Sequence, residues 1–412
     1  MGNIFFDANV LYDAGAKAMS GSKFKYATQL YEANHLLYTA MLQKSLSDGT
    51  YTPTSGKKFL ISERGKTRFI TSNTTVDKMV NHVLCDEILT PCLAKYLIYD
   101  NGASQKGKGV DFHRRRFTAH LHKYFMGHGT NEGYILLGDL SGYYANILHD
   151  TCYKVLEHFL LRSMDDPAFV LTLLRKIFTT FRLDVSRFSD DEIRRMYAGK
   201  VDPMLNLHAD PRTLTGVKFL LKGVDIGNQL SQNIGIIYPY RLDNFAKIVS
   251  GIKHYGRYTD DFYAMSSSRE ELERLLDGLK AIAKEFGILI NDKKTRIVKL
   301  SGFYRHLQDG YCLTETGRVI RKINPKSITR ERRKLKAYKR LLKSGRITYA
   351  EIENIFKSWL GANFKRMSHR QIYQMSELFH ALFGRNPKWK KKRGKTRSKL
   401  RWLMAHNSSS WN

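Results

Sequence analysis

The chain has 412 residues, 42% of them hydrophobic, which excludes wholesale disorder and suffices for two or three domains or one polymerase-sized assembly. It carries 69 Lys and Arg against 38 Asp and Glu, a formal net charge of +31. An excess of this size repels itself in a compact fold, so it predicts a nucleic-acid partner rather than a generically basic protein.

The cysteines and the apolar runs predict a cytoplasmic protein. The four cysteines, Cys85, Cys92, Cys152 and Cys312, form no CxxC pair and no zinc-like spacing, which indicates reduced thiols. No apolar run approaches the roughly 18 residues of a membrane-spanning helix, so no membrane contact is expected. The N-terminus also lacks the basic start and long apolar run of a signal peptide.

The predicted elements of the first half are helices interrupted by a hairpin and a buried strand. Residues 1–50 carry apolar residues at helical spacing and predict a helical extension. FLISERGKTRFITS, residues 59–72, predicts a hairpin around a Glu-Arg-Gly-Lys turn. A helical segment with a break at Pro91 follows. GYILLGDLSGYYANI, residues 133–147, predicts a buried strand that runs into a turn, and 151–182 is predicted to be helical.

The second half mixes strands and helices before a helical and basic end. In chain order it predicts a polar surface insertion over 183–215, and then a Gly-bounded turn with a long helix over 223–249. A strand–turn–strand over 254–266, an amphipathic helix over 269–288 and a strand over 288–300 are predicted next. Three helices are predicted from Pro325 to Phe383. The three helices are separated at Ser344–Gly345 and at Met367–Ser368. Residues 385–401 are a run of Arg and Lys around Trp389.

Two adjacent carboxylates, Asp260 and Asp261, lie at the predicted turn of the aromatic stretch HYGRYTDDFYAMS. When both are ionised they repel, unless a cation such as Mg²⁺ lies between them and keeps positions open for phosphates. Asp139 ends the apolar strand YILLGD and supplies a third carboxylate. Carboxylates of this kind hold two metal ions about 3.5–4 Å apart for phosphoryl transfer. For each Asp, a turn or capping role is the structural alternative.

An ordered series of motifs resembles the reverse transcriptase family. YTDD at 258–261 resembles the Tyr-x-Asp-Asp box, and GDLSGYYANI resembles the first catalytic motif. GNQLSQ, FGILINDKKT and LSGFY resemble the motifs between and after these two. GKTRFITSNTTVDKMVNHVLCDEIL and IYDNGASQKGKG resemble fingers segments, and all occur in the family order over about residues 55–385.

The resemblance implies an α+β right-hand polymerase with fingers, a palm built on an antiparallel sheet, and a helical thumb. Residues 1–50 would be an N-terminal helical extension and 51–323 the fingers and palm. Residues 324–384 would be the thumb and 385–412 a basic tail. We find neither an RNase H carboxylate set after the thumb nor an HNH-like Cys/His cluster.

The resemblance also implies roles for the catalytic residues. Asp139, Asp260 and Asp261 match the metal-binding carboxylates, joined by the backbone carbonyl of Leu140. They would hold two Mg²⁺ ions, with Mn²⁺ as the alternative, to activate the primer hydroxyl and stabilise pyrophosphate. Lys294, in DKKT, matches a lysine able to protonate pyrophosphate, although a solvated lysine is an equal alternative.

Nucleotide binding is implied for a second group of residues. Lys66 and Arg68 match the fingers hairpin that holds the triphosphate, where a guanidinium makes bidentate contacts, and solvated charges on a surface hairpin are the alternative. Tyr144 matches an aromatic steric gate that admits only deoxynucleotides, and its alternative is a core tyrosine. Gly227 lets the backbone approach a base closely.

Template and primer contacts are implied along the rest of the chain. Ser231 and Gln232 match the helix that cradles the template base, and Gly302 with Phe303 matches the primer grip. The basic thumb helix is expected to follow phosphates. The tail is expected to gain order on a polyanion, and its basic block includes Lys390, Lys391, Lys392 and Arg393.

The expected partners are a structured noncoding RNA that also serves as template, the cDNA product and dNTPs. Because RNA helices are read mostly by shape and backbone, no RNA sequence can be inferred. An accessory protein or a second copy of the chain stays open as a further partner.

Departures from the intron and retron pattern narrow the subclass. Ile226-Gly227 and Ser231-Gln232 stand where those enzymes carry Gln-Gly and Ser-Pro, which resembles the enzymes of bacterial diversity-generating retroelements. Relatives that act in phage defence are equally compatible. Gln105 replaces an Arg often found before the Lys-Gly pair, which leaves one template contact in doubt.

Three rival functions stay open. The first is a template-independent or protein-primed DNA polymerase of an antiviral system. The second is an RNA-directed RNA polymerase, against which Tyr144 argues. The third is a non-catalytic RNA-binding scaffold, which the presence of all three carboxylates disfavours.

Overall fold

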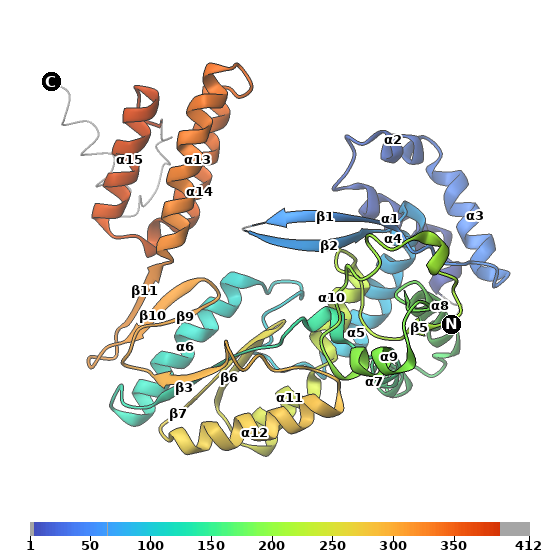
Figure 1. Ribbon diagram of the computed structural model, residues 1–412, viewed down its shortest axis with the longest axis horizontal. Coiled ribbons are helices and arrows are strands. Elements are labelled where there is room, and N and C mark those ends of the chain that lie inside the picture. The colour runs from blue at the N-terminus through green and yellow to red at the C-terminus, as the bar shows by residue number, and fades with distance from the viewer. Residues whose placement is uncertain (1–3, 64, 388–412) are drawn as a thin grey trace. The chain divides into compact units, whose positions relative to one another are not determined.

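The computed structural model describes residues 4–63 and 65–387, except for the side chain of Lys66 (Figure 1). Its contacts divide it into two units: one combines residues up to 120 with 133–299, and the other combines 121–132 with the residues from 300 onward. The predicted boundary between palm and thumb at 323 and 324 marks a division by function and stays a prediction.

The first unit begins with helices, as predicted for residues 1–50. They are η1 (Ile4–Phe6), α1 (Ala8–Met19), α2 (Tyr26–Ala33) and α3 (His35–Ser47). Asp7 caps α1, because its carboxylate accepts the Asn9 N–H at 2.8 Å. Helix α1 packs on α4 (Thr75–His82).

The predicted hairpin is confirmed. β1 (Lys57–Glu63) pairs antiparallel with β2 (Lys66–Ser72), from Lys57 opposite Ser72 to Glu63 opposite Lys66. The break predicted at Pro91 is wrong. α4 continues through the π-helical turn η2 (Val83–Leu89) into α5 (Thr90–Ala94), and Pro91 follows directly on the turn in which the Thr90 N–H bonds the Cys85 carbonyl five residues back, so the regular hydrogen-bond ladder is already displaced there.

A four-stranded antiparallel sheet forms the centre of the first unit, in the order β6-β7-β3-β8. Its strands are β3 (Tyr134–Asp139), β6 (His254–Tyr258), β7 (Asp261–Ser266) and β8 (Arg296–Lys299). The predicted buried strand and strand–turn–strand are thereby confirmed. The strand predicted over 288–300 is wrong for its first part, because the N–H of Thr295 bonds the Asn291 carbonyl at 2.8 Å and closes a turn before β8.

Helices cover both faces of this sheet (Figure 1). Side chains alternate along β7, so Phe262 and Tyr263 point to opposite faces. α12 (Arg269–Glu285) buries Leu272, Leu275 and Leu279 in the same core cluster as Phe262. The first part of α6 (Val110–His128) contacts the other face, where the Phe117 ring lies 4.7 Å from that of Tyr263.

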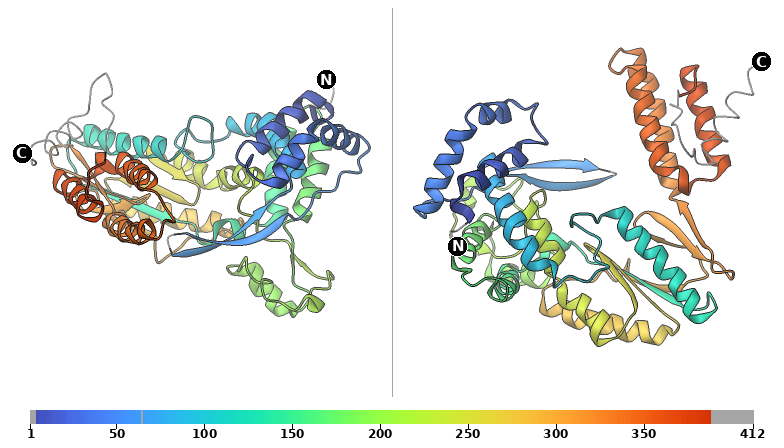
Figure 2. Two further views of the ribbon diagram at one scale, coloured as in Figure 1. Left: turned by 90° about the horizontal axis from the view of Figure 1, so that it is seen from above. Right: turned by 180° about the vertical axis from the view of Figure 1, so that it is seen from behind.

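Between β3 and β6 the chain forms helices and a small lobe. The helical prediction for 151–182 resolves into α7 (His149–Leu161) and α8 (Ala168–Thr179). The predicted insertion holds β4 (Leu183–Asp184), α9 (Asp190–Ala198) and η4 (Pro211–Thr213), and β4 pairs with β5 (Phe219–Leu220). Together with β5 the insertion has its own core of Val185, Val201 and Leu220, and this lobe projects in green in the left view of Figure 2.

The single long helix predicted within 223–249 is wrong. The chain forms α10 (Gln229–Ile237), α11 (Tyr240–Asn244) and the π-helical turn η5 (Phe245–Val249). Pro239 separates α10 from α11 because it has no N–H to continue the hydrogen-bond ladder.

The second unit combines a three-stranded sheet with three helices. The strand order is β11-β10-β9, formed by β9 (Tyr304–His306), β10 (Asp309–Leu313) and β11 (Val319–Ile323). The three predicted helices are confirmed as α13 (Pro325–Lys343), α14 (Tyr349–Asn363) and α15 (His369–Phe383), with η6 (Phe364–Arg366) before the last. Buried Asp309 of β10 pairs with Arg321 of the neighbouring strand and with Arg366 of η6, and the second pair joins the sheet to the helical part.

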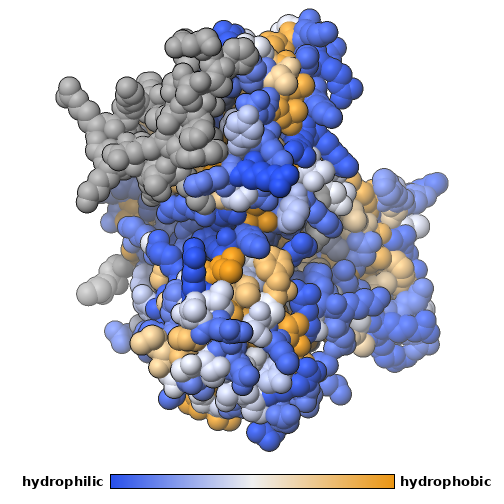
Figure 3. Space-filling view, turned by 90° about the vertical axis from the view of Figure 1, so that its left-hand side faces the viewer, coloured by the Kyte–Doolittle hydropathy of each residue, from blue (hydrophilic) through white to orange (hydrophobic). Residues whose placement is uncertain are grey.

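The surface agrees with the composition. On the face drawn in Figure 3, hydrophilic residues predominate and hydrophobic residues form only small groups. Within the described ranges, no helix combines the length and the apolar character that crossing a membrane requires. Cys85, Cys92, Cys152 and Cys312 are free of disulfides.

Candidate active site

The three predicted carboxylates follow from the pairing of two neighbouring strands. β3 ends at Asp139, which lies opposite Asp261, the first residue of β7. The N–H of Leu140 donates to the Asp260 carbonyl at 2.9 Å, and Leu140 also pairs with Ile290. Opposed residues of antiparallel strands lie about 4.5–5.5 Å apart at Cα. The backbone therefore brings all three carboxylates to one end of the sheet.

Lys294 reaches this group through the turn before β8. Its Nζ lies 2.9 Å from each carboxylate oxygen of Asp139, whose side chain is 14% exposed. Asn291, which the sequence analysis did not single out, bonds the Asp139 carbonyl through its N–H at 2.8 Å and the carboxylate through Nδ2 at 3.1 Å. The turn thus fixes Asp139 and places the predicted proton donor beside it.

The donor set suits divalent cations. Carboxylate and carbonyl oxygens are the ligands that Mg²⁺ and Mn²⁺ favour. Among the residues that the structure describes, no three His, Cys, Asp or Glu side chains are grouped as a metal site. The Asp139 carboxylate is instead neutralised by Lys294. An ion at Asp139 would therefore have to replace this ammonium contact.

Tyr144 lies beside the carboxylates on the turn η3 (Tyr143–Asn146). Its carbonyl accepts the Val224 N–H at 2.9 Å, which fixes the backbone. A Cβ at Gly235 would lie 2.6 Å from the Tyr144 hydroxyl, so the ring passes over α10 where only glycine leaves room. Burial raises the pKa of Tyr144 to about 12, and the Asp260 charge adds to the effect. The Tyr144 ring is therefore packed against α10, at the position predicted for the steric gate.

The β1–β2 hairpin, predicted to belong to the fingers, is more exposed to solvent than the carboxylate end of the sheet. Arg68 pairs with Glu63 at 3.2 Å, and both side chains are about half exposed. Lys66 begins β2, and its side chain lies outside the described part of the chain. The N–H of Thr71 donates to the Ile226 carbonyl at 2.9 Å, which joins the base of the hairpin to the segment before Gly227.

Gly227 and α10 carry the residues that are predicted to cradle the template base. Gly227 has a φ of 121°, and a Cβ there would lie 2.8 Å from the Thr71 carbonyl, so the close approach requires glycine. Asn228 caps α10 by accepting the Ser231 N–H at 2.7 Å. Ser231 is buried and its Oγ has no hydrogen-bond partner among the described residues, whereas Gln232 is exposed.

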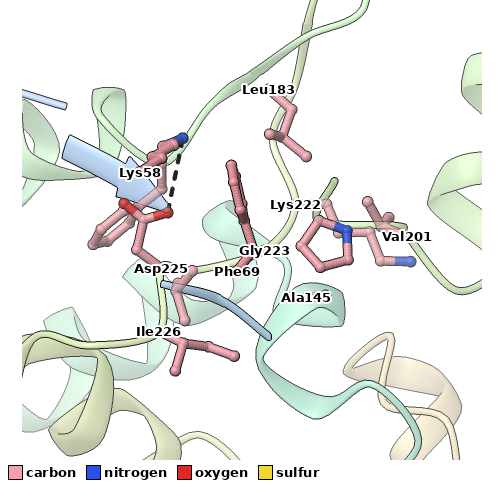
Figure 4. A pocket seen from close by; sticks show the side chains of 12 residues that line it. Lys58, Phe69, Ala145, Leu183, Val201, Lys222, Gly223, Asp225 and Ile226 are labelled. Carbon is pink, nitrogen blue, oxygen red and sulfur yellow. Dashed lines mark ion pairs between the residues drawn. The ribbon is translucent and has the colours of Figure 1, made fainter. Parts of the chain in front are cut away.

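A small cavity lies behind the hairpin (Figure 4). Its volume is about 50 Å³, and Lys58, Phe69, Ala145 and Asp225 contribute to its wall. Burial raises the pKa of Asp225, whose carboxylate lies 3.9 Å from the Lys58 ammonium. A cavity of this size holds a few water molecules and no nucleotide.

The other residues predicted to contact the template or the primer lie in the second unit or outside the described residues. Gly302 and Phe303 precede β9; Phe303 is 55% exposed, and the Lys322 ammonium lies 5.9 Å from its ring centre. The tail residues Lys390, Lys391, Lys392 and Arg393 lie outside the described residues.

Comparison with known families decides the relationship. The model of the family "Reverse transcriptase (RNA-dependent DNA polymerase)" matches residues 56–308, more than half of the chain. The chain belongs to the reverse transcriptase family. The expected α+β polymerase fold is thereby confirmed, with the antiparallel sheet as its palm. No curated protein sequence matches the chain.

Among solved structures, the chain is similar to two yeast telomerases. Telomerase from Candida albicans in complex with a TWJ fragment of telomeric RNA is 13% identical over 86% of this chain and 62% of that chain, with a TM-score of 0.45. Apo telomerase from Candida tropicalis is 15% identical over 80% of this chain and 62% of that chain, with a TM-score of 0.44. The chain therefore spans less than two thirds of the length of either telomerase chain.

Besides Asn291, a second residue beside the carboxylates was missed from the sequence. Arg257, two residues before Thr259, is completely buried and bonds the Thr259 carbonyl at 2.9 Å. A charged residue in an otherwise apolar and aromatic strand is a signal that could have identified it, because a buried charge requires a partner.

Proposed function

We propose that this chain is an RNA-directed DNA polymerase that synthesises cDNA from dNTPs. The observation that carries the proposal is the pairing of Asp139 with Asp261 beside Asp260, at neighbouring strand ends, in a chain of the reverse transcriptase family. Three carboxylates brought together at the ends of neighbouring strands are suited to phosphoryl transfer with divalent ions.

Asp139, Asp260, Asp261 and the Leu140 carbonyl would hold two Mg²⁺ ions, or Mn²⁺ in their place. When bound, such ions lower the barrier by activating the attacking hydroxyl and neutralising the leaving phosphates. Asn291 keeps Asp139 in place through two hydrogen bonds. Lys294 would leave Asp139 and donate a proton to the pyrophosphate oxygen, for which its 54% exposed side chain is free to turn outward.

The nucleotide would lie between the hairpin and Tyr144. Arg68 and Lys66 would bind the triphosphate. The sugar would lie against the Tyr144 ring, which would leave no room for a ribose 2′-hydroxyl. Gly227, Ser231 and Gln232 would support the template base, with exposed Gln232 making the contact and buried Ser231 shaping the helix.

The template would be a structured noncoding RNA. The net charge of +31 and the Arg and Lys residues of α13 favour a polyanion along the second unit, where exposed Phe303 would contact the primer. We place the enzyme in the bacterial cytoplasm, which its free thiols suit. Its role would be in a diversity-generating retroelement or in antiphage defence, and an accessory protein or a second copy could join it.

The proposal is tested by sequencing the nucleic acid that copurifies with the protein, before and after addition of dNTPs and Mg²⁺. We expect one defined RNA, and new DNA complementary to it. DNA with no complement in that RNA would instead indicate template-independent synthesis. RNA binding with no DNA made from any primer would favour a scaffold.

A further inference from the structure

The turn that presents Asp260 and Asp261 rests on a buried guanidinium. Thr259, the residue before the pair, has a φ of 55°, a left-handed conformation that a β-branched residue rarely adopts. Arg257 has no exposed surface, and its Nη1 donates to the Thr259 carbonyl oxygen at 2.9 Å. The Arg257 side chain therefore stabilises the unfavourable backbone conformation of Thr259, in the turn that presents Asp260 and Asp261.

Asp243 on α11 balances this charge. Nε and Nη2 of Arg257 donate to its two carboxylate oxygens at 2.8 and 2.7 Å, and the Tyr255 hydroxyl donates to the same carboxylate at 2.8 Å. Burial acts to lower the pKa of Arg257, but the Asp243 charge outweighs it and the pKa lies above its ordinary value. A bidentate pair of this kind fixes the plane of the guanidinium.

The same guanidinium also reaches α10. Nη2 of Arg257 donates to the Ile236 carbonyl at 2.7 Å, in the last turn of that helix. The preceding carbonyl, that of Gly235, accepts the Tyr143 hydroxyl at 3.0 Å. Tyr143 lies next to the gate residue Tyr144, and α10 begins just after Gly227. These two contacts join the end of α10 to the stretch that follows Asp139 and to the strand before the catalytic turn, and the start of the same helix carries the predicted template cradle.

The backbone of Arg257 is held as well. Its N–H donates to the Asp100 carbonyl at 3.2 Å, and its carbonyl accepts the Gly102 N–H at 3.0 Å. Because the main chain and the guanidinium are both held by hydrogen bonds, Thr259 would lose its bond to Nη1 if the turn moved. The planar guanidinium donates four hydrogen bonds, two to the Asp243 carboxylate and one each to the Ile236 and Thr259 carbonyls. A lysine ammonium is a point charge with three donors, so it cannot make the same set.

We propose that Arg257 is a positioning residue, which with Asp243 fixes the Thr259 conformation and aligns Asp260 and Asp261 with Asp139 and with the template cradle. The inference deepens the proposed polymerase function and rests on it. Arg257 lies in the interior, so it acts through the turn and touches no substrate.

The test compares Arg257→Lys with Arg241→Lys, a matched change at an exposed Arg that pairs with Glu285 at 2.7 Å. Mn²⁺ binding without nucleic acid is followed by electron paramagnetic resonance, and single-turnover nucleotide incorporation is measured together with primer–template affinity. We expect Arg257→Lys to bind Mn²⁺ roughly tenfold more weakly and to incorporate roughly 100-fold more slowly, because about 1 Å of misplacement has that effect. Primer–template affinity should stay within about twofold, and Arg241→Lys should match the wild type.

Several results would overturn the inference. Folded Arg257→Lys protein with wild-type Mn²⁺ affinity and incorporation would show that the turn does not need the guanidinium. Equal losses in Arg241→Lys would show a general effect on stability. If Arg257→Lys fails to fold, Asp243→Asn, which keeps the shape and loosens the fork, must still weaken Mn²⁺ binding. If the wild-type protein binds Mn²⁺ but extends no primer, the polymerase function is wrong. The difference in Mn²⁺ affinity between the wild type and Arg257→Lys would still test whether Arg257 aligns the carboxylates.

Discussion

Two hairpins of the first unit carry functional charges, and they are anchored in opposite ways. The β6–β7 turn lies against the ion pair of Arg257 and Asp243, whose side chains are 1% and 3% exposed. The β1–β2 hairpin carries the ion pair of Arg68 and Glu63, with exposures of 49% and 55%. A surface pair contributes about 0–1 kcal/mol, whereas removing one partner of a buried pair costs about 3–5 kcal/mol.

The difference matches two tasks of a polymerase. Metal-binding carboxylates need one geometry, because small displacements of reacting groups slow a reaction strongly. A hairpin that receives a nucleotide and releases pyrophosphate needs to open and close. We therefore expect changes at the buried turn to affect the chemical step and changes at the open hairpin to affect nucleotide binding.

The largest effect is expected from the double variant Asp260→Asn with Asp261→Asn. Loss of both charges removes the metal-binding set, so nucleotide incorporation should fall by about 1000-fold or more. Primer–template affinity should be nearly unchanged. A matched control is Asp190→Asn with Asp191→Asn, an exposed adjacent pair on α9, which should behave as wild type. Activity retained by the first variant would remove the catalytic role of the turn.

Tyr144→Ala tests the wall beside the turn. Loss of the ring opens space at the sugar, so the preference for dNTPs over ribonucleotides should fall by about 100-fold, measured as the ratio of incorporation efficiencies. Tyr144→Phe should keep the preference, because the ring and not the hydroxyl excludes the 2′-hydroxyl. An unchanged preference in the alanine variant would return Tyr144 to the role of a core residue.

Lys294→Ala tests the proton donor. If its ammonium protonates pyrophosphate, the maximal rate should fall by about 100-fold and the solvent deuterium isotope effect should largely vanish. The neighbouring Lys293→Ala, also exposed, serves as control and should keep both. A loss of rate with an unchanged isotope effect would show that Lys294 acts through its contact with Asp139 and does not donate the proton.

The smallest effect is expected at the open hairpin. Arg68→Ala removes a phosphate contact and should raise the KM for dNTPs by about tenfold with little change in the maximal rate. Glu63→Ala breaks the same surface pair from the other side and should not raise the KM. A fall in the maximal rate with KM unchanged would contradict the proposed division between the two hairpins.

The local elements of the site were predictable from the sequence. YILLGD ends in a carboxylate after an apolar run, and YTDD lies in a strand–turn–strand pattern, so both carboxylate positions follow from local rules. The fingers hairpin and the three late helices follow from turn residues and apolar spacing in the same way.

The long-range parts were not predictable. Arg257 and Asp243 are joined by folding and not by spacing, so no local rule pairs them. Pro91 predicts a break, because local rules do not foresee the π-helical turn before it. The apolar residues at both ends of 288–300 predict one continuous strand, so the turn before β8 was not foreseen. The contact between Lys294 and Asp139 forms only when β8 pairs with β3.

The central claim, synthesis of DNA directed by RNA, is tested most directly by single-nucleotide incorporation on four RNA templates that differ only in the first template base. Each template is offered all four dNTPs one at a time with Mg²⁺. We predict that each template selects its complementary dNTP and that the double Asn variant incorporates none. The same nucleotide added to all four templates would contradict the claim.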